Sequence, residues 1–149
     1  MIFGGLFPDL PASEHTALAA EKERLFRAQL GVLSPTPGVA RILSYARQVG
    51  ARTAVVTNAP RENATAMLTG LRIADCLDTI VIGGELAQGK PHPTPYLTAL
   101  EVLDAAAEDA SGRDDSHRPH AQLCAAPMQS GAGVSEVDVH QFLRLTRAR

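Results

Sequence analysis

The feature that most constrains the fold is a short apolar run that ends in polar side chains. Residues 53–56 are Thr-Ala-Val-Val, and Thr57 and Asn58 follow directly. Uncharged, largely β-branched residues without polar alternation are typical of a strand that is covered on both faces of a parallel sheet. We therefore predict a buried strand over residues 53–57, with polar side chains at its carboxyl end.

The segments around this run alternate between helical and strand patterns. Apolar residues recur at helical spacing over about residues 37–49, 61–71 and 94–103, and a second uncharged run, residues 79–82, is Thr-Ile-Val-Ile. This alternation is typical of right-handed units in which helices cover a parallel sheet. The sequence predicts an α/β fold over residues 35–104. Its two strands are fewer than the roughly four to six of a stable open sheet.

The two ends of the chain have different patterns. From Ser13, a helix-capping residue, an apolar stripe with charged residues on the solvated side predicts an amphipathic helix. Residues 105–133 are rich in Ala, Ser, Gly and His without a clean period, which indicates a poorly ordered segment with no strand. Ser135 and Asp138 resemble a capping box, so we expect a short helix over about residues 135–147.

Composition excludes several classes of function. The chain has 149 residues, enough for one domain, and a net charge of −2, which gives no electrostatic case for a nucleic-acid or anionic-membrane partner. No apolar run has the length needed to span a bilayer. Cys76 and Cys124 are too few for a disulfide scaffold and are expected to be free thiols. We expect a cytoplasmic protein without nucleic-acid or membrane partners.

A second polar segment follows the second strand. Residues 89–91 are Gly-Lys-Pro, so Lys90 comes after the run at residues 79–82. Because ligands of open α/β sheets bind at the carboxyl ends of the strands, we expect Thr57, Asn58 and Lys90 to lie together there. A helix that begins just after Asn58 would direct free N–H groups at the same place, which suits an anion such as phosphate.

Each of these residues also has a simpler interpretation. Thr57 and Asn58 are suited to ending a strand and capping a helix, and Lys90 on its own is suited to an exposed surface. The paired spacing of the two polar segments favours the binding site. A P-loop, suggested by Gly84, Gly89 and Lys90, is disfavoured because a proline follows the lysine where that motif requires a serine or threonine hydroxyl.

The two polar segments carry a family resemblance. Residues 54–63 (Ala-Val-Val-Thr-Asn-Ala-Pro-Arg-Glu-Asn) and 89–96 (Gly-Lys-Pro-His-Pro-Thr-Pro-Tyr) closely resemble two motifs of the haloacid dehalogenase-like (HAD) hydrolases. Within that family they are most similar to the β-phosphoglucomutase-like phosphatases and mutases. Residues 6–27 also resemble the later part of the helical cap of that branch. The resemblance covers about residues 3–103.

The resemblance implies a domain organisation. Residues 1–34 would be the remnant of a helical cap, and residues 35–104 a partial Rossmann-like core. Residues 105–149 would be a divergent, partly disordered tail. Because a partial sheet exposes edges and apolar surface, we expect a marginally stable monomer or a self-associating species.

The resemblance also implies a site and a chemistry. Thr57 matches the motif residue whose hydroxyl hydrogen-bonds the transferred phosphoryl group, and Lys90 matches a lysine that offsets the charge of nucleophile and phosphate. The implied substrate is a small phosphorylated metabolite of the sugar phosphate class, with Mg²⁺ as cofactor. The residues implied to bind phosphate or substrate, by side chain or backbone, are Thr57, Asn58, Ala59, Arg61, Asn63 and Lys90.

The sequence departs from the family pattern in two places. The D-x-D motif that supplies the nucleophile in that family is absent. Asp9 is not a substitute, because it lies between prolines in an expected loop. We therefore expect the chain to begin inside the cap and to be catalytically impaired. Asp114 and Asp115 lie where the family has Mg²⁺ ligands, but no strand pattern precedes them, and a solvated turn is the alternative. The competing functional hypothesis is a non-catalytic relative that binds phosphate or another protein.

Overall fold

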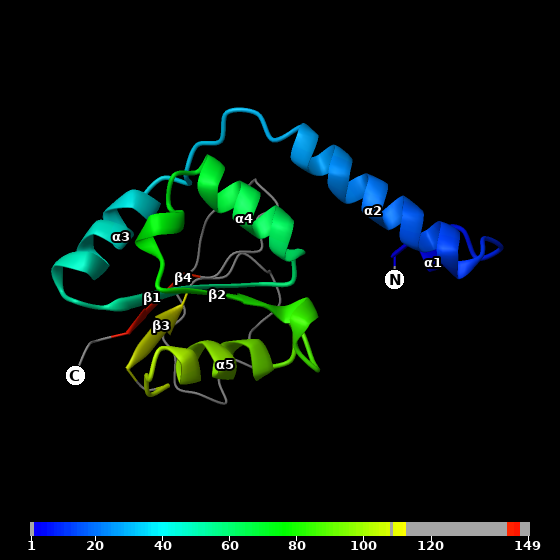
Figure 1. The fold of residues 1–149 in the computed structure, drawn as a ribbon. Coiled ribbons are helices and arrows are strands. Elements are labelled where there is room, and N and C mark those ends of the chain that lie inside the picture. The colour runs from blue at the N-terminus through cyan, green and yellow to red at the C-terminus, as the bar shows by residue number, and fades with distance from the viewer. Residues whose placement is uncertain (1, 108, 113–142, 147–149) are drawn as a thin grey trace.

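The described residues form helices on both faces of a four-stranded sheet with strand order β2-β1-β4-β3 (Figure 1). The structure is a computed structural model that describes residues 2–107, 109–112 and 143–146. The strands are β1 (Arg52–Thr57), β2 (Thr79–Ile82), β3 (Ala110–Gly112) and β4 (Leu143–Thr146). The helices are α1 (Ile2–Leu6), α2 (Ala12–Ala28), α3 (Val39–Gln48), α4 (Arg61–Gly70) and α5 (Thr94–Val102), with short 3-10 helices η1 (Ala74–Cys76) and η2 (Gly83–Glu85).

Strand β1 is covered on both faces, as its sequence predicts. On one face Val55 packs with Leu43 of α3 and Leu68 of α4. On the other face Ala54 and Val56 pack against α5. Figure 1 shows α3 and α4 on one side of the sheet and α5 on the opposite side. The predicted α/β fold and its two parallel strands are therefore confirmed.

A set of hydrogen bonds fixes the start of β1 against the start of β2, and the pairing of the two strands sets where they end. The backbone N–H of Thr53 donates to Oδ2 of Asp78 at 2.6 Å, and the Thr53 hydroxyl donates to the carbonyl of Cys76 at 2.8 Å. The parallel pairing places Thr57 opposite Ile82. Because both strands end at the same level, the segments that follow them begin side by side at one edge of the sheet.

The region after residue 105 contains strands that the sequence analysis did not predict. Strand β4 pairs antiparallel with β1 and β3, and its residues 143–146 lie where a C-terminal helix was expected. That prediction is wrong for these residues. Leu-Arg-Leu-Thr alternates with period two, and the free edge of β1 offers unpaired backbone groups that a strand satisfies. Residues 135–142, the rest of the predicted helix, lie outside the described residues.

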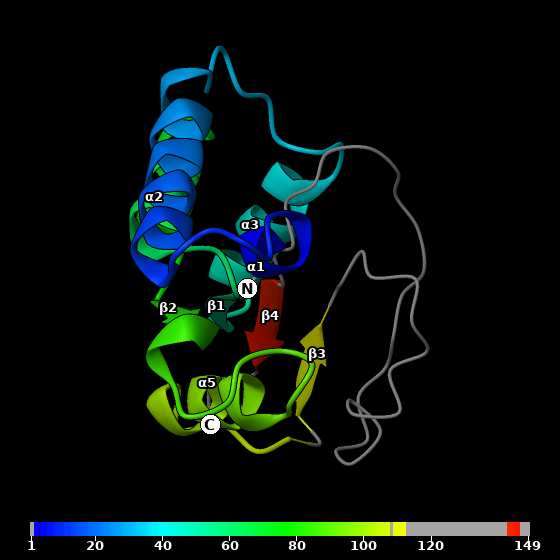
Figure 2. The same ribbon diagram turned by 90° about the vertical axis from the view of Figure 1, so that its right-hand side faces the viewer.

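Helix α2 lies against α4 and away from the sheet (Figures 1 and 2). It begins at Ala12, so Ser13 lies in its first turn and is not the cap that was predicted. None of its residues is buried, and Leu18, Leu25 and Phe26 are each about two-fifths exposed. This apolar surface is consistent with the expected self-association, which stays a prediction.

Two further expectations concern cysteines and membranes. Cys76 has an exposed free thiol, as expected, and Cys124 lies outside the described residues. Within the described ranges, every helix is too short or too polar to cross a bilayer.

Candidate functional site

Thr57 ends β1 at the edge where the predicted site should lie. Its side chain is buried, with a relative exposure of 2%, and its hydroxyl oxygen accepts the backbone N–H of Ala59 at 3.0 Å. This local bond turns the chain out of the strand and into α4, which begins at Arg61. Among the described residues no side chain caps α4, so its first-turn N–H groups face the strand end without a side-chain acceptor.

Asn58 joins this strand end to the second polar segment. Its Oδ1 accepts the backbone N–H of Lys90 at 2.9 Å, and its Nδ2 donates to the Lys90 carbonyl at 2.7 Å. One carboxamide therefore satisfies both backbone polar groups of a residue 32 positions away. The structure thus brings Asn58, which follows Thr57 at the strand end, into direct contact with the Lys90 backbone.

The Lys90 side chain extends into the protein rather than into solvent. Its Nζ is buried and lies 5.9 Å from the centroid of the Tyr96 ring, at a distance typical of a cation–π contact. Tyr96 itself is buried in the α5 side of the core. A surface position for Lys90, the simpler interpretation from sequence, is therefore excluded for the described structure.

Arg61 makes a contact that the sequence analysis did not foresee. Its Nε and Nη2 donate to the two carboxylate oxygens of Glu85 at 2.7 and 2.6 Å. Glu85 belongs to η2, so the pair links the start of α4 to the segment that follows β2. Both side chains are about half exposed. A substrate contact for Arg61 stays a prediction and would have to compete with this pair.

The Arg61–Glu85 pair has a pH signature. The hydrogen bond from Arg61 lowers the pKa of Glu85 and raises the pKa of Arg61. Because the Glu85 pKa is lower in the folded chain, the pair is fully present above the ordinary glutamate pKa and is lost as the pH falls through the lowered value. We expect an NMR titration of the carboxyl groups to show this shift, and Arg61→Ala to reverse it.

A control for this titration lies on α2. The pKa of Glu21 is lowered chiefly by a hydrogen bond from Arg24, which is separate from Arg61. It should stay lowered in Arg61→Ala. An unchanged Glu85 titration in that variant would contradict the assigned pairing.

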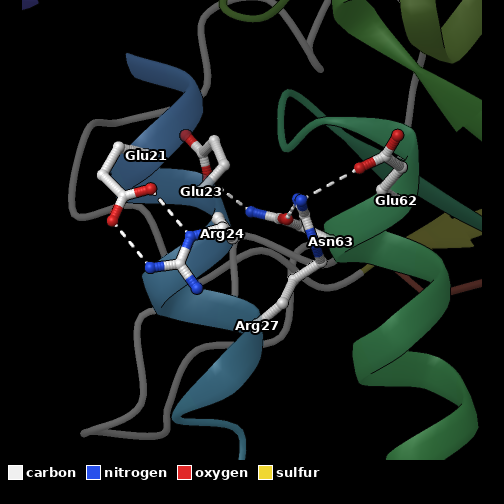
Figure 3. A network of polar contacts seen from close by, with 6 residues as sticks. All are labelled: Glu21, Glu23, Arg24, Arg27, Glu62 and Asn63. Carbon is white, nitrogen blue, oxygen red and sulfur yellow. Dashed lines mark hydrogen bonds and ion pairs between the residues drawn. The ribbon is translucent and has the colours of Figure 1, made fainter. Parts of the chain in front are cut away.

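Asn63 connects α4 to α2 (Figure 3). Its Oδ1 accepts Nη1 of Arg27 at 2.7 Å, and its Nδ2 donates to the carboxylate of Glu23. Arg27 also pairs with Glu62 at 3.1 Å. Asn63 is only 4% exposed, so its amide is fully engaged between the two helices. The structure gives Asn63 a helix-docking contact, and its predicted substrate contact remains a prediction without support here.

The residues on α2 that hold Asn63 were missed by sequence reasoning. Glu23 and Arg27 belong to the charged side of α2 that was expected to face only solvent. Amphipathic spacing identifies which residues lie outside the apolar face of a helix, but it does not show which of those residues contact a second helix. A signal is present only in Asn63 itself, a polar residue on a helix position that faces inward.

Asn63→Ala is expected to loosen α2 from α4. The variant removes one neutral amide that satisfies Arg27 and Glu23, so we expect a loss of about 1–3 kcal/mol in local stability. Amide exchange across residues 12–28 measures it, and protection there should fall while protection in β1 is retained. Glu21→Ala, at an exposed pair along α2, is the control and should behave as wild type. Equal protection of α2 in Asn63→Ala and wild type would contradict the docking role.

The predicted magnesium site is not formed by the described residues. In the part of the chain that the structure describes, no three His, Cys, Asp or Glu side chains gather where they could hold a metal ion. Glu85, the carboxylate at the start of the segment that leads to Lys90, is paired with Arg61. Asp114 and Asp115 lie outside the described residues. The described side chains therefore do not form a Mg²⁺ site by themselves.

Comparison with known proteins assigns the chain to a family. Residues 13–122 match the model of the haloacid dehalogenase-like hydrolases. Beta-phosphoglucomutase of Bacillus subtilis is 29% identical over 119 residues, which cover 78% of this chain and 52% of that protein. A phosphorylated carbohydrates phosphatase of Thermotoga maritima is 31% identical over 64% of this chain and 43% of its own length.

A third relative extends the match. Phosphoglycolate phosphatase of Xylella fastidiosa is 32% identical over 125 residues, which cover 83% of this chain and 55% of that enzyme. The chain thus spans about half the length of the curated relatives it matches. The matched residues include both strand ends and the helices that follow them. The chain belongs to the haloacid dehalogenase-like hydrolase family.

Proposed function

We propose that this chain binds the phosphoryl group of a small phosphorylated metabolite at the carboxyl ends of β1 and β2. The observation that carries the proposal is the double hydrogen bond between Asn58 and the Lys90 backbone, because it joins the two polar segments at one place. The relatives named for phosphorylated carbohydrates and for phosphoglycolate support a substrate of this class.

The residues at this edge have complementary tasks in the proposed site. The Thr57 oxygen accepts the Ala59 N–H, which leaves the hydroxyl proton available to a phosphate oxygen. The start of α4 adds backbone N–H groups and the positive end of the helix dipole. The Lys90 ammonium supplies a full positive charge. Phosphoryl transfer depends mainly on positioning and charge stabilisation, which are the contributions these groups make.

For the hydrolytic step we propose the activity of the family, a phosphatase or phosphomutase of the sugar phosphate class. No D-x-D pattern occurs anywhere in the sequence, so this chain does not contain the aspartate pair that the resemblance requires. This favours a second candidate function, a relative that binds phosphate without turning it over. A requirement for Mg²⁺, held by Asp114 and Asp115, belongs to the first function and is likewise proposed. A cytoplasmic location is proposed with either function.

Hydrolysis of an aryl phosphate, with and without Mg²⁺, distinguishes the two functions. Magnesium-dependent turnover that is lost in Lys90→Ala would establish a hydrolase. Saturable phosphate binding by a folded chain without turnover would establish the binding function. A folded chain with neither property would contradict the proposal.

A further inference from the structure

The side chain of Asn58 is oriented toward the protein backbone rather than toward a ligand. Its oxygen faces the N–H of Lys90 and its nitrogen faces the Lys90 carbonyl, at 2.9 and 2.7 Å. Only one of the two orientations of the carboxamide satisfies both partners. Aspartate could accept the N–H, but it would place its second oxygen against the carbonyl oxygen. The geometry therefore selects asparagine.

Two glycines make room for this contact. A Cβ on Gly83 would lie 2.1 Å from Oδ1 of Asn58 and 3.2 Å from the Cα of Gly89. A Cβ on Gly89 would lie 2.9 Å from the same oxygen and 3.1 Å from the Gly83 carbonyl oxygen. Any side chain at Gly83 would push the Asn58 carboxamide out of its place. Such a variant therefore disrupts the contact without a substitution at Asn58. Both glycines lie on the segment between β2 and Lys90.

From this arrangement we propose that Asn58, with Gly83 and Gly89, forms a clasp that positions Lys90, and that Asn58 is not itself a phosphate ligand through its side chain. The proposal deepens the proposed phosphate site and rests on it. Lysine has a long side chain with considerable rotamer freedom, so holding its backbone fixes the point from which the ammonium group extends. Contact with the Tyr96 ring then restricts the far end of the same side chain.

A matched pair of glycine variants tests the clasp. Gly83→Ala introduces the clash with Asn58, whereas a Cβ on the adjacent Gly84 meets no atom within 4 Å. Both substitutions make the same chemical change within η2, so Gly84→Ala controls for the general effect of alanine there. Asn58→Ala removes the carboxamide directly and supplies a second route to the same loss.

The first readout is amide exchange at Lys90, measured by NMR. In Asn58→Ala and Gly83→Ala the Lys90 amide should exchange roughly 3- to 10-fold faster, as expected for the loss of a modest hydrogen bond. In Gly84→Ala it should exchange as in wild type. Unchanged exchange in Asn58→Ala would overturn the proposal. This readout does not depend on phosphate binding, so it decides the clasp even if the wild-type chain binds no phosphate and the proposed function fails.

The second readout is the affinity for inorganic phosphate in a double-mutant cycle. Asn58→Ala should weaken binding roughly 3- to 10-fold when Lys90 is present and should have little further effect in the Lys90→Ala background. That non-additivity is the signature of a residue that acts through Lys90. An equal loss in both backgrounds would show that Asn58 contacts phosphate itself and would overturn the proposal. Wild-type affinity in Asn58→Ala would also overturn it, while leaving the phosphate site in place.

Discussion

Lys90→Ala is expected to weaken the binding of inorganic phosphate by about 10- to 100-fold. A hydrogen bond to a charged group contributes about 1.5–3 kcal/mol, and each 1.4 kcal/mol changes an affinity about tenfold. The buried position of the Lys90 ammonium favours the upper part of this range, because water screens the charge less there. Isothermal titration calorimetry on the folded variant measures the change.

The sequence offers a matched control for this experiment. Lys22 is the other lysine of the chain, and it lies on α2 with about half of its side chain exposed. Lys22→Ala removes the same charge and the same side chain from a place outside the proposed site. Its phosphate affinity should equal that of wild type. Similar losses in the two variants would mean that net charge, and not the site, controls binding.

Leu68→Ala is expected to destabilise the chain by about 3 kcal/mol. Leu68 has 0% exposure and packs with Leu43, Val55 and Ile73 between α4, α3 and the sheet. Alanine would leave a cavity at the centre of this cluster. Since domains of this size are stable by only about 5–15 kcal/mol, the loss is a large fraction of the total. Urea unfolding followed by circular dichroism measures it.

A second leucine provides the comparison for this variant. Leu97 lies on α5 with 54% exposure, so Leu97→Ala removes the same atoms from a partly solvated position and should cost under about 1 kcal/mol. The phosphate affinity of the folded Leu68→Ala chain should remain near that of wild type, because Leu68 packs in the core cluster and is not one of the residues of the proposed phosphate site. Equal destabilisation by the two variants would contradict the assignment of the core.

The central strands were predictable because their signal is local. Residues 53–57 and 79–82 are uncharged runs without polar alternation, which indicates strands that are buried on both faces of a sheet. The structure confirms both strands. The order of the polar segments then placed Thr57 and Lys90 at one edge, since parallel strands end together. These inferences needed only sequence spacing and the geometry of α/β sheets.

Other features depend on contacts that no single segment reveals. Strand β4 forms because β1 has a free edge, and residues 143–146 alone gave too short a pattern to identify it. Asn63 was expected near substrate because of its position in α4, but its neighbours are Glu23 and Arg27 on a distant part of the chain. Asn58 was expected to bind phosphate by its side chain or its backbone N–H, and the structure places the side chain on the Lys90 backbone. In each case the partner lies far away in sequence.

The account is tested most directly by an NMR titration of the wild-type chain with inorganic phosphate. If the phosphate site is correct, saturable shifts will concentrate on the backbone amides of residues 57–59, 61, 62 and 90, and Lys90→Ala will reduce them. Saturable shifts confined to α2, or no saturable shift in a folded chain, would contradict it.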